Sequence, residues 1–290
     1  MIKKGLILAG GLGTRMSPLT KAVNKQLLPI YDKPLIYYPL SVLMLAGIKD
    51  VLIIVNKGQL SQFRKILSNG ERFGIKIKFI EQNSPRGLPD AFILGEKFIG
   101  KDNIALILGD NFFYAQSLTK KLKECIKLSN GCKVLLHSVN FPELYGVATL
   151  NKNKKVISLK EKPKKSKSNL AVTGLYFFDN KVINYSKSLK PSKRKELEII
   201  DLLNKYKKNN KLKAEFLGRG GAWLDTGSID DFYNTSAFVS ALENRQGLKI
   251  ACLEEIAFNN KWIDKKKISE SINFYGNCLY SKYLKKILKR

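Results

Sequence analysis

The sequence predicts an α/β fold: a three-layer sandwich in which helices cover both faces of a mainly parallel, mixed sheet. Three observations indicate it. Apolar runs of strand length alternate along the chain with segments whose apolar residues recur at helical spacing. The first apolar run leads directly into a glycine-rich turn, a common arrangement at the end of a strand in such sheets. The 290 residues, 44% of them hydrophobic, are enough to bury one large core.

Strands are expected wherever a short apolar run is bounded by turn residues. These runs are residues 5–9, 50–55, 76–81, 105–108, 133–139 and 175–178. The segments between them have apolar residues at helical spacing and predict helices at residues 39–46, 60–67, 90–98 and 118–128. Residues 146–150 and 156–161 flank an Asn-Lys-Asn-Lys-Lys turn, so we expect an antiparallel hairpin, inserted midway as a flap.

The C-terminal part of the chain has a different pattern. Beyond about Thr226 it looks helical, and it ends in an amphipathic tail, residues 280–290, with Leu284, Ile287 and Leu288 on one side. We therefore expect one domain over residues 1–240 and a helical C-terminal segment, residues 241–290, packed on that same domain.

Composition argues against membrane proteins and zinc proteins. No apolar run reaches the roughly 18 residues of a membrane span, and the opening Met-Ile-Lys-Lys leads into a strand instead of a signal peptide, so we expect a cytoplasmic protein. The single histidine, His137, lies in an apolar run and is expected in the core. The four cysteines lack the spacing of a zinc site, and we expect reduced thiols at Cys125, Cys132, Cys252 and Cys278.

The formal net charge of +28 is a feature that nucleic-acid-binding proteins share. However, 44 of the 52 basic residues are Lys and only 8 are Arg, whereas readout of bases and bidentate phosphate contacts favour Arg. The surplus is also spread over turns and helix faces. We therefore expect no nucleic-acid partner, and interpret the charge as a Lys-rich surface that attracts anionic substrates.

The most informative local signal is the turn after the first strand, Gly10-Gly-Leu-Gly-Thr-Arg15. Its three glycines allow positive φ and bring backbone N–H donors close to an anion, while Thr14 and Arg15 add charge-assisted hydrogen bonds. The spacing matches neither the Walker A loop nor the dinucleotide-binding fingerprint. The turn therefore predicts a phosphate-binding loop of another kind.

Three further polar residues each have two interpretations. Lys25 is either an ordinary surface lysine or a second cation that, with Arg15, neutralises a triphosphate. Asp110 follows the strand at 105–108, and Asp225 lies in the sequence Trp-Leu-Asp-Thr-Gly. Each carboxylate is either a turn or helix cap, or a ligand of Mg²⁺ beside phosphate oxygens.

Together these motifs resemble those of the sugar-1-phosphate nucleotidylyltransferases. The resemblance spans nearly the whole chain and is carried by residues 10–15, 25–29, 31–39, 108–111, 145–146, 161–163, 172–176, 196–198 and 223–227. It implies the Rossmann-like fold of nucleotide-diphospho-sugar transferases. It also implies that residues 1–240 are the catalytic domain and that residues 241–290 form an interface and regulatory segment.

The resemblance implies transfer of a thymidylyl group from dTTP to glucose 1-phosphate, giving dTDP-glucose and pyrophosphate, the first step of dTDP-rhamnose and other deoxysugar biosynthesis. Two alternatives stay open: an enzyme that prefers UTP or another hexose 1-phosphate, and a sugar-nucleotide-binding regulator without catalysis. The family is usually a homotetramer, and we expect one here. Ala115 and Thr119 depart from relatives that show end-product inhibition, so that regulation is left open.

The resemblance also implies a metal site and three catalytic residues. Asp110 and Asp225 are expected to hold Mg²⁺. Arg15 is expected on the triphosphate, Lys25 on the leaving pyrophosphate and Lys162 on the phosphate of the sugar. No histidine base is needed, because the attacking sugar phosphate is already an anion and can attack the α-phosphorus in line.

The remaining site residues fall into two groups. Nucleotide binding is expected from Gly10, Gly13, Thr14, Arg15, Lys25, Gln26, Gln82, Gly87 and Asp110. Sugar-phosphate binding is expected from Asn111, Tyr145, Gly146, Glu161, Lys162 and Val172. Within the first group, Gln82 offers both a donor and an acceptor to the edge of a pyrimidine, and Gly87 permits a backbone contact with the base.

Overall fold

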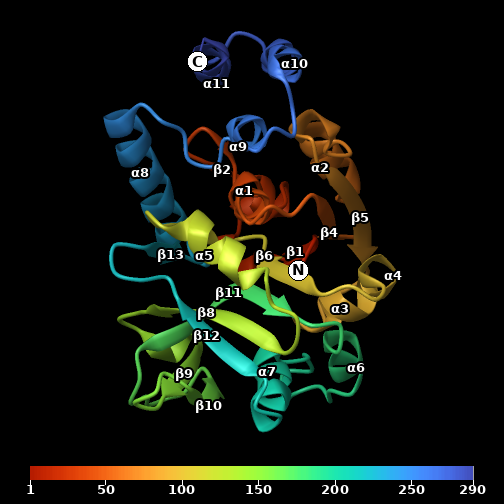
Figure 1. Cartoon of the computed structure of the whole chain (residues 1–290), viewed down its shortest axis with the longest axis vertical. Helices are drawn as coiled ribbons and strands as arrows, with labels where there is room; N and C mark the ends of the chain where they lie inside the picture. The colour runs from red at the N-terminus through yellow and green to blue at the C-terminus, as the bar shows by residue number, and fades with distance from the viewer. Residues whose placement is uncertain (290) are drawn as a thin grey trace.

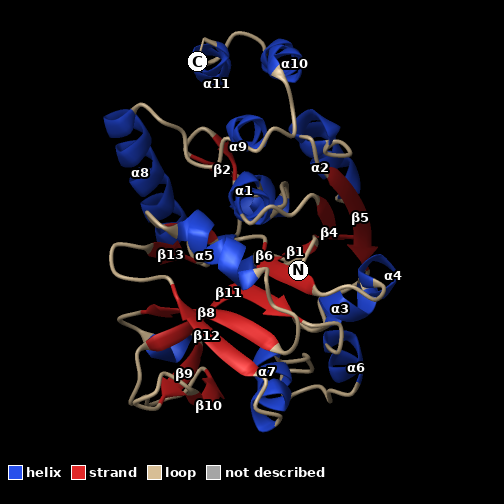
Figure 2. Cartoon of the chain, viewed as in Figure 1, coloured by secondary structure: helices blue, strands red, loops and turns tan. Residues whose placement is uncertain are grey.

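The structure, a computed structural model, describes residues 1–289 and has the predicted three layers, with a sheet between two groups of helices (Figures 1 and 2). The nine-stranded sheet runs β10-β9-β11-β6-β1-β4-β5, and β8 joins it by pairing with both β11 and β12. Its strands are β1 (Lys4–Ala9), β4 (Asp50–Asn56), β5 (Lys76–Gln82), β6 (Ile104–Leu108), β8 (Cys132–Ser138), β9 (Gly146–Leu150), β10 (Val156–Glu161), β11 (Leu170–Phe178) and β12 (Leu212–Phe216).

The sheet is mixed. Strand β1 pairs in parallel with β4 and β6, and β4 pairs in parallel with β5, whereas β11 is antiparallel to β6, β8 and β9. Side chains alternate between two cores: Ile7 of β1 belongs to one hydrophobic cluster and its neighbour Leu6 to the other. The central strands are therefore apolar on both faces, as strands covered on both sides must be.

Each core has its own set of helices. One is closed by α1 (Tyr37–Leu45), α2 (Leu60–Leu67), α5 (Leu118–Cys125) and α9 (Leu253–Asn259). The other is closed by α3 (Asp90–Leu94), α4 (Glu96–Ile99), α6 (Val182–Lys187) and α7 (Ile199–Lys208). Figure 1 shows α1 and α9 on one side of the sheet and α6 and α7 on the other.

The expected helical C-terminal part is present as α8 (Ile229–Gln246), α9, α10 (Lys265–Tyr275) and α11 (Leu279–Leu288). Helix α8 is continuous across residue 240, the expected domain boundary. Helices α10 and α11 pack on each other and on α9, at the end of the molecule farthest from β9 and β10 (Figure 1). Leu284 and Ile287 of α11 are buried, as the amphipathic pattern predicts, and the last residue of the predicted tail, 290, lies outside the described residues.

Some expected elements differ in their limits. The predicted helix at 90–98 is two short helices, α3 and α4, which meet at Gly95, the residue of that run with the weakest helix propensity. Strand β11 begins at Leu170, five residues before the expected start at 175. The predicted flap is confirmed as the antiparallel pair of β9 and β10.

Two small strand pairs lie outside the main sheet. Strands β2 (Pro29–Ile30) and β3 (Lys33–Pro34) form a hairpin, and β7 (Phe112–Tyr114) pairs with the distant β13 (Ala222–Leu224). The second pair matters for the site, because Asp110 precedes β7 and Asp225 follows β13. Antiparallel pairing of Leu224 with Phe112 brings these two carboxylates to the same place.

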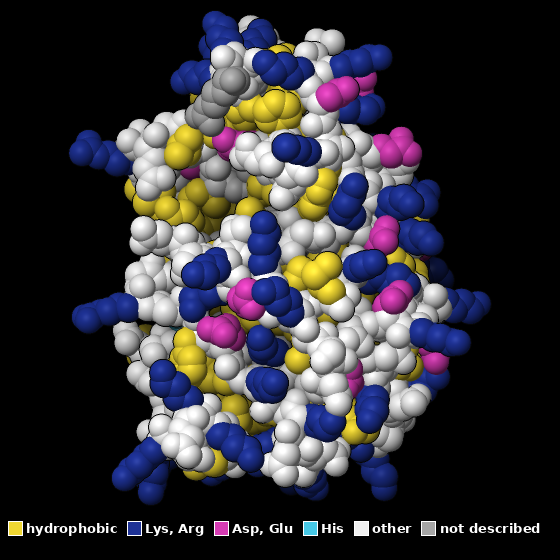
Figure 3. Space-filling model, viewed as in Figure 1, with side chains coloured by type: hydrophobic (Ala, Val, Ile, Leu, Met, Phe, Trp, Pro, Cys, Tyr) yellow, Lys and Arg dark blue, Asp and Glu magenta, His cyan; other side chains and the backbone are white. Residues whose placement is uncertain are grey.

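The surface and the thiols agree with the expectations from composition. Lys and Arg side chains are distributed over the whole visible face in Figure 3 and do not gather in one patch. All four cysteines are free, and three of them are buried. His137 is half-buried instead of lying in the core. Within residues 1–289, no helix has the length and apolar character needed to cross a membrane.

Candidate functional site

The glycine-rich loop leaves the end of β1 and passes into a short 3₁₀ helix, Thr14–Met16. Gly13, before that helix, has a φ of 62°, and an added Cβ would lie 2.9 Å from Cγ2 of Thr20. The Thr20 hydroxyl also donates to the Gly13 carbonyl at 2.8 Å. Thr14 and Arg15 are exposed beside this turn. A glycine is thus required at 13, and the loop presents its two polar side chains to solvent.

Three successive carbonyl oxygens of this loop accept hydrogen bonds from amide side chains. The pairs are Asn24 Nδ2 with Ala9 O at 3.3 Å, Gln82 Nε2 with Gly10 O at 2.5 Å and Asn56 Nδ2 with Gly11 O at 3.3 Å. Within residues 1–289, the N–H groups of residues 11–14 donate no hydrogen bond to the protein. The loop therefore has its acceptors held and its donors available, which is the arrangement that an anion needs.

The two carboxylates Asp110 and Asp225 lie together beside the loop. The Thr226 hydroxyl donates to the Asp110 carbonyl at 2.7 Å and ties the two segments to each other. Burial raises the pKa of Asp225, and the negative charge of Asp110 raises it further. Two neighbouring carboxylates fit Mg²⁺, which typically takes one or two carboxylates and completes its shell with phosphate oxygens and water.

The two carboxylates do not belong to a larger cluster of metal-binding side chains among the described residues. No group of three or more His, Cys, Asp or Glu side chains suited to a metal ion occurs within residues 1–289. A cation held here would therefore depend on the substrate for part of its coordination. That dependence is typical of Mg²⁺ sites that act on nucleoside triphosphates.

Two cations join the two carboxylates. Lys25 is buried, only 5% exposed, and its Nζ lies 2.8 Å from Oδ2 of Asp110. Arg15 lies near Asp225, because a Cβ added to Gly227 would lie 3.2 Å from both Nη2 of Arg15 and Oδ2 of Asp225. The structure thus brings together the two cations and two carboxylates that the sequence singled out. We call Arg15, Lys25, Asp110 and Asp225 the open quartet.

Gln26 lies next to Lys25 and is buried. Its backbone N–H is capped by Oδ1 of Asn24 at 2.8 Å, which orients the short 3₁₀ helix Lys25–Leu27. Its side-chain Oε1 is buried without a hydrogen-bond partner within the described residues. An unpaired buried acceptor costs free energy, so this atom is suited to accept a ligand hydroxyl.

The side chain of Asn111, which was expected to bind the sugar, already makes several hydrogen bonds within the protein. Its Oδ1 accepts from Nε1 of Trp223 at 2.6 Å and from the Gly174 N–H at 3.1 Å. Its Nδ2 donates to Oδ1 of Asp110 at 3.0 Å. Asn111 therefore orients the Asp110 carboxylate, and one N–H of its amide is left over for the sugar contact expected from sequence.

The residues expected at the sugar lie along β9, β10 and β11. Tyr145 precedes β9 and its ring lies 5.1 Å from that of Trp223. Burial, and then the charge of Asp225, raise the pKa of Tyr145 to about 12, so Tyr145 lies close to the open quartet. A side chain at Gly146 would displace Ile200, because a Cβ would lie 2.7 Å from Cδ1 of Ile200. Val172 is buried on β11.

Glu161 is the last residue of β10, and Lys162 follows it directly, beside Tyr145. Lys162 is exposed, and its backbone has a φ of 41°, in the left-handed region that side chains other than Gly rarely adopt. Its N–H donates to the Tyr145 carbonyl at 3.0 Å. Such strain at an exposed cation agrees with a functional position.

Sequence reasoning gave no role to Arg194 and Glu198, which adjoin Glu161. Nη2 of Arg194 lies 2.8 Å from Oε2 of Glu198 and 3.4 Å from Oε1 of Glu161. Burial, and then the charge of Glu198, raise the pKa of Glu161. The only signal in the sequence was that residues 196–198 belong to the motifs that carry the resemblance.

The residues expected at the base occupy the end of β5 and the loop after it. Gln82 is buried against Gly10, as described above. Gly87 has a φ of 99°, and an added Cβ would lie 2.2 Å from the Leu197 carbonyl oxygen. The close approach of these two backbones requires glycine at 87 and joins the base side of the site to the segment that carries Arg194 and Glu198.

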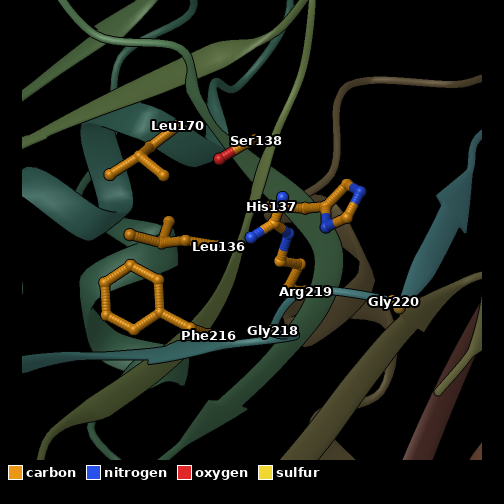
Figure 4. A pocket seen from close by; sticks show the side chains of 9 residues that line it. Leu136, His137, Ser138, Leu170, Phe216, Gly218, Arg219 and Gly220 are labelled. Atoms are coloured by element: carbon orange, nitrogen blue, oxygen red, sulfur yellow. The ribbon is translucent and has the colours of Figure 1, made fainter.

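A separate cavity of about 420 Å³ lies where β8 and β12 end. Figure 4 shows Arg219 and His137 on one side of it and Leu136, Leu170 and Phe216 on another. None of the described residues that line it was expected in the site. Burial lowers the pKa of its His137, and the centroid of the His137 ring lies 6.4 Å from that of Trp223.

Comparison with known proteins gives consistent matches. A family model described as nucleotidyl transferase matches residues 4–241. Glucose-1-phosphate thymidylyltransferase of Neisseria meningitidis serogroup A is 50% identical over 287 residues, covering 99% of this chain and 100% of the relative. The enzyme of the same name from Xanthomonas campestris pv. campestris is 47% identical over 288 residues, covering 99% of this chain and 98% of the relative. Among solved structures, UDP-glucose pyrophosphorylase with UDP-glucose has a TM-score of 0.73 at 28% identity, covering 85% of this chain and 100% of that one.

Proposed function

Because the chain belongs to the nucleotidyl transferase family, we propose that it transfers a thymidylyl group from dTTP to glucose 1-phosphate, with release of pyrophosphate. One observation of the structure supports the proposal above all. Two cations and two carboxylates, the open quartet, lie beside a glycine-rich loop whose N–H groups are available. This combination binds a triphosphate and neutralises charge during transfer of a phosphoryl-type group.

The triphosphate is proposed to lie on the N–H groups of residues 11–14, with the Arg15 guanidinium over its oxygens. Lys25 uses one of its three ammonium N–H donors on Asp110, so two remain for the pyrophosphate that leaves. Mg²⁺, held by Asp110 and Asp225, would supply additional neutralisation of the phosphate charge when bound. The work of the protein is thus positioning and electrostatic stabilisation.

The sugar phosphate is proposed to bind on the side of the site that β9, β10 and β11 form. Lys162, exposed and held in a left-handed conformation, neutralises its phosphate, and Arg194 lies close enough to share that task. Glu161 accepts hydrogen bonds from sugar hydroxyls, and Gly146 and Val172 line the ring. The phosphate is already ionised at neutral pH, so the site needs no general base to generate the nucleophile.

The base is proposed to contact Gln82 and Gly87 at the end of β5. Gln26 is suited to the deoxyribose, because its buried Oε1 lacks a partner within the described residues and can accept a hydroxyl. Asn111 contributes mainly by orienting Asp110. These assignments place the nucleotide along β1 and β5 and the sugar along β9 to β11.

Release of pyrophosphate from glucose 1-phosphate tests the proposal, measured with dTTP and with UTP in the presence of Mg²⁺ and again with excess EDTA. Turnover with dTTP that exceeds turnover with UTP, and that EDTA abolishes, is the expected result. A preference for UTP would mean that the protein is a general sugar-activating enzyme, similar to its structural neighbour UDP-glucose pyrophosphorylase. Absence of turnover with both would favour a binding protein and contradict the proposal.

We also propose that the protein is a homotetramer in the cytoplasm, as the resemblance implies. The oligomeric state can be checked by light scattering, in which a mass of 32.8 kDa, that of one chain, would contradict it.

A further inference from the structure

Two backbone carbonyls of the glycine-rich loop fix the orientation of two amide side chains. The Gly10 carbonyl accepts from Gln82 at 2.5 Å, and the Gly11 carbonyl accepts from Asn56 at 3.3 Å. A backbone carbonyl can only accept a hydrogen bond, so each amide must turn its nitrogen, not its oxygen, toward the loop. The orientation of both amides therefore follows from the position of the main chain.

The two amides also bind each other. Because Nδ2 of Asn56 faces Gly11, its Oδ1 faces the other way and accepts from Nε2 of Gln82 at 3.0 Å. The Gln82 amide has two N–H donors, and these two acceptors use both of them. The approach is close: a Cβ on Gly10 would lie 2.0 Å from Nε2 of Gln82, so only glycine at 10 allows it.

One polar atom of Gln82 then remains for a ligand. Its Oε1 has no hydrogen bond within residues 1–289, while the residue as a whole is only 5% exposed. A freely rotating glutamine could offer either a donor or an acceptor to a base. In this arrangement Gln82 offers an acceptor alone.

We propose that Asn56 is a positioning residue for base selection: it holds Gln82 so that only Oε1 faces the base, which admits uracil and thymine and rejects cytosine. Uracil and thymine carry an N–H at ring position 3, which can donate to Oε1. Cytosine has an unprotonated nitrogen there, so that two acceptors would face each other. This inference rests on the proposed placement of the base at Gln82.

Reversal of the Gln82 amide is costly for two reasons. Its oxygen would lie against the Gly10 carbonyl and against Oδ1 of Asn56, both of which are acceptors. Rotation of the Asn56 amide would relieve the second conflict, but it would turn Oδ1 toward the Gly11 carbonyl. The orientation of the Gln82 amide therefore cannot be reversed by reorienting one side chain alone.

The test compares Asn56→Asp with Asn56→Leu, two substitutions of similar size. Both remove the hydrogen bond to Gly11, but only Asp keeps an acceptor for Gln82. The measured quantity is the ratio of the dissociation constants of dCTP and dUTP, which share sugar and phosphates, determined by calorimetry on the intact protein. Any general loss of nucleotide affinity cancels in this ratio.

We expect dCTP to bind the unmodified protein about 100-fold more weakly than dUTP, or worse. Asn56→Asp should keep that ratio within about threefold, and Asn56→Leu should lower it about tenfold, the value of one hydrogen bond. Equal binding of dCTP and dUTP by the unmodified protein would overturn the inference. So would an equal change in both variants, because that result would mean that Asn56 only supports the loop.

A third variant separates this inference from the placement on which it rests. Gln82→Ala should bring the ratio close to one. A ratio that is unchanged in Gln82→Ala would show that another group recognises the base. That result would overturn both the placement of the base at Gln82 and the positioning role of Asn56. The binding measurement needs no turnover, so the two proposals can fail separately. If the protein discriminates dUTP from dCTP but releases no pyrophosphate, the proposed activity is refuted and the positioning role of Asn56 stays supported.

Discussion

Two groups of charged side chains in this protein have the same composition but different environments. The open quartet contains two cations and two carboxylates, and so does a second group, Asp32, Lys33, Glu243 and Lys249, which we call the closed quartet. In the closed quartet each lysine contacts both carboxylates, with Nζ of Lys33 at 2.8 Å from Glu243 and Nζ of Lys249 at 3.1 Å from it. No side chain of the closed quartet is more than 18% exposed.

The open quartet is only partly self-neutralised. Lys25 contacts one carboxylate, Asp110, whose side chain is 28% exposed, and Arg15 is exposed beside Asp225. Asp225 keeps a raised pKa, first from burial and then from Asp110, despite the two cations. Charges that neutralise one another fully, as in the closed quartet, act as a structural anchor between segments. Charges that are only partly neutralised, as in the open quartet, are left available to bind a ligand.

The closed quartet also joins the elements that carry the open one. Asp32 and Lys33 belong to the hairpin of β2 and β3, which follows Lys25 in the chain, and Glu243 lies near the end of α8, which follows Asp225. Glu243 further accepts from the N–H of Ile250 at 2.8 Å. The anchor thus fixes the two segments from which the site is built.

Substitution of Lys25 should give the largest effect on rate. In Lys25→Met we expect kcat to fall on the order of 10²- to 10³-fold, because the leaving pyrophosphate loses a positioned cation. Stability in urea should change little, since Asp110 is exposed enough to be solvated. The measurement is steady-state pyrophosphate release beside equilibrium unfolding. Near-normal turnover with native stability would remove Lys25 from the site.

Substitution of Lys33 should have the opposite signature. Lys33→Met leaves two buried carboxylates with one partner, and we expect a loss of about 3 kcal/mol in the free energy of unfolding. Turnover per folded molecule should stay within a few-fold of normal, measured well below the urea midpoint. If kcat fell as far as in Lys25→Met while stability held, the distinction between anchor and site would be wrong.

The two quartets were not equally visible in the sequence. Arg15 stands in a local motif, Gly10–Arg15, and Lys25 follows it closely, so the open quartet could be predicted from motifs and from the resemblance that they carry. The closed quartet joins Lys33 to Glu243, more than 200 residues away. Asp32 and Lys33 lie within residues 31–39, which carry the resemblance, but nothing local shows that Lys33 is buried against Glu243.

The fold shows the same limit. Strands such as β1 and β6 are continuous apolar runs, because they are covered on both faces, and they were predicted. Strand β12 was missed: it pairs only with β8 at the edge of the sheet, and its Lys213 and Glu215 interrupt the apolar pattern. The amides of Asn24 and Asn56 were missed for a similar reason, since their value comes from loop carbonyls that only the folded chain brings near.

Lys249 should show a smaller and pH-dependent effect. Burial opposes its charge, but hydrogen bonds to Asp32 and Glu243 outweigh burial and raise its pKa above the ordinary 10.5. A lysine whose pKa is raised by folding stabilises fully below the unfolded pKa, and this contribution is lost as the pH rises through the folded pKa. We therefore expect Lys249→Met to be less stable than the unmodified protein by about 1–2 kcal/mol at pH 8.

The difference between the two proteins should shrink as the pH is raised beyond 10.5, because the lysine that distinguishes them is then losing its charge. Urea unfolding at pH 8 and pH 11 measures both values. A difference that stays constant or grows with pH would contradict the sign of the argument and indicate that Lys249 stabilises by packing alone.

The smallest effect should come from an exposed ion pair that is shorter than either contact of Glu243 in the closed quartet. Nζ of Lys187, on α6, lies 2.6 Å from Oε1 of Glu96, on α4, but both side chains are nearly half exposed. Water already solvates both charges, so Lys187→Met should change the free energy of unfolding by less than about 0.5 kcal/mol and leave turnover unchanged. A loss comparable to that in Lys33→Met would mean that contact distance, and not burial, decides which charges hold this fold, and the contrast between the two quartets would lose its physical basis.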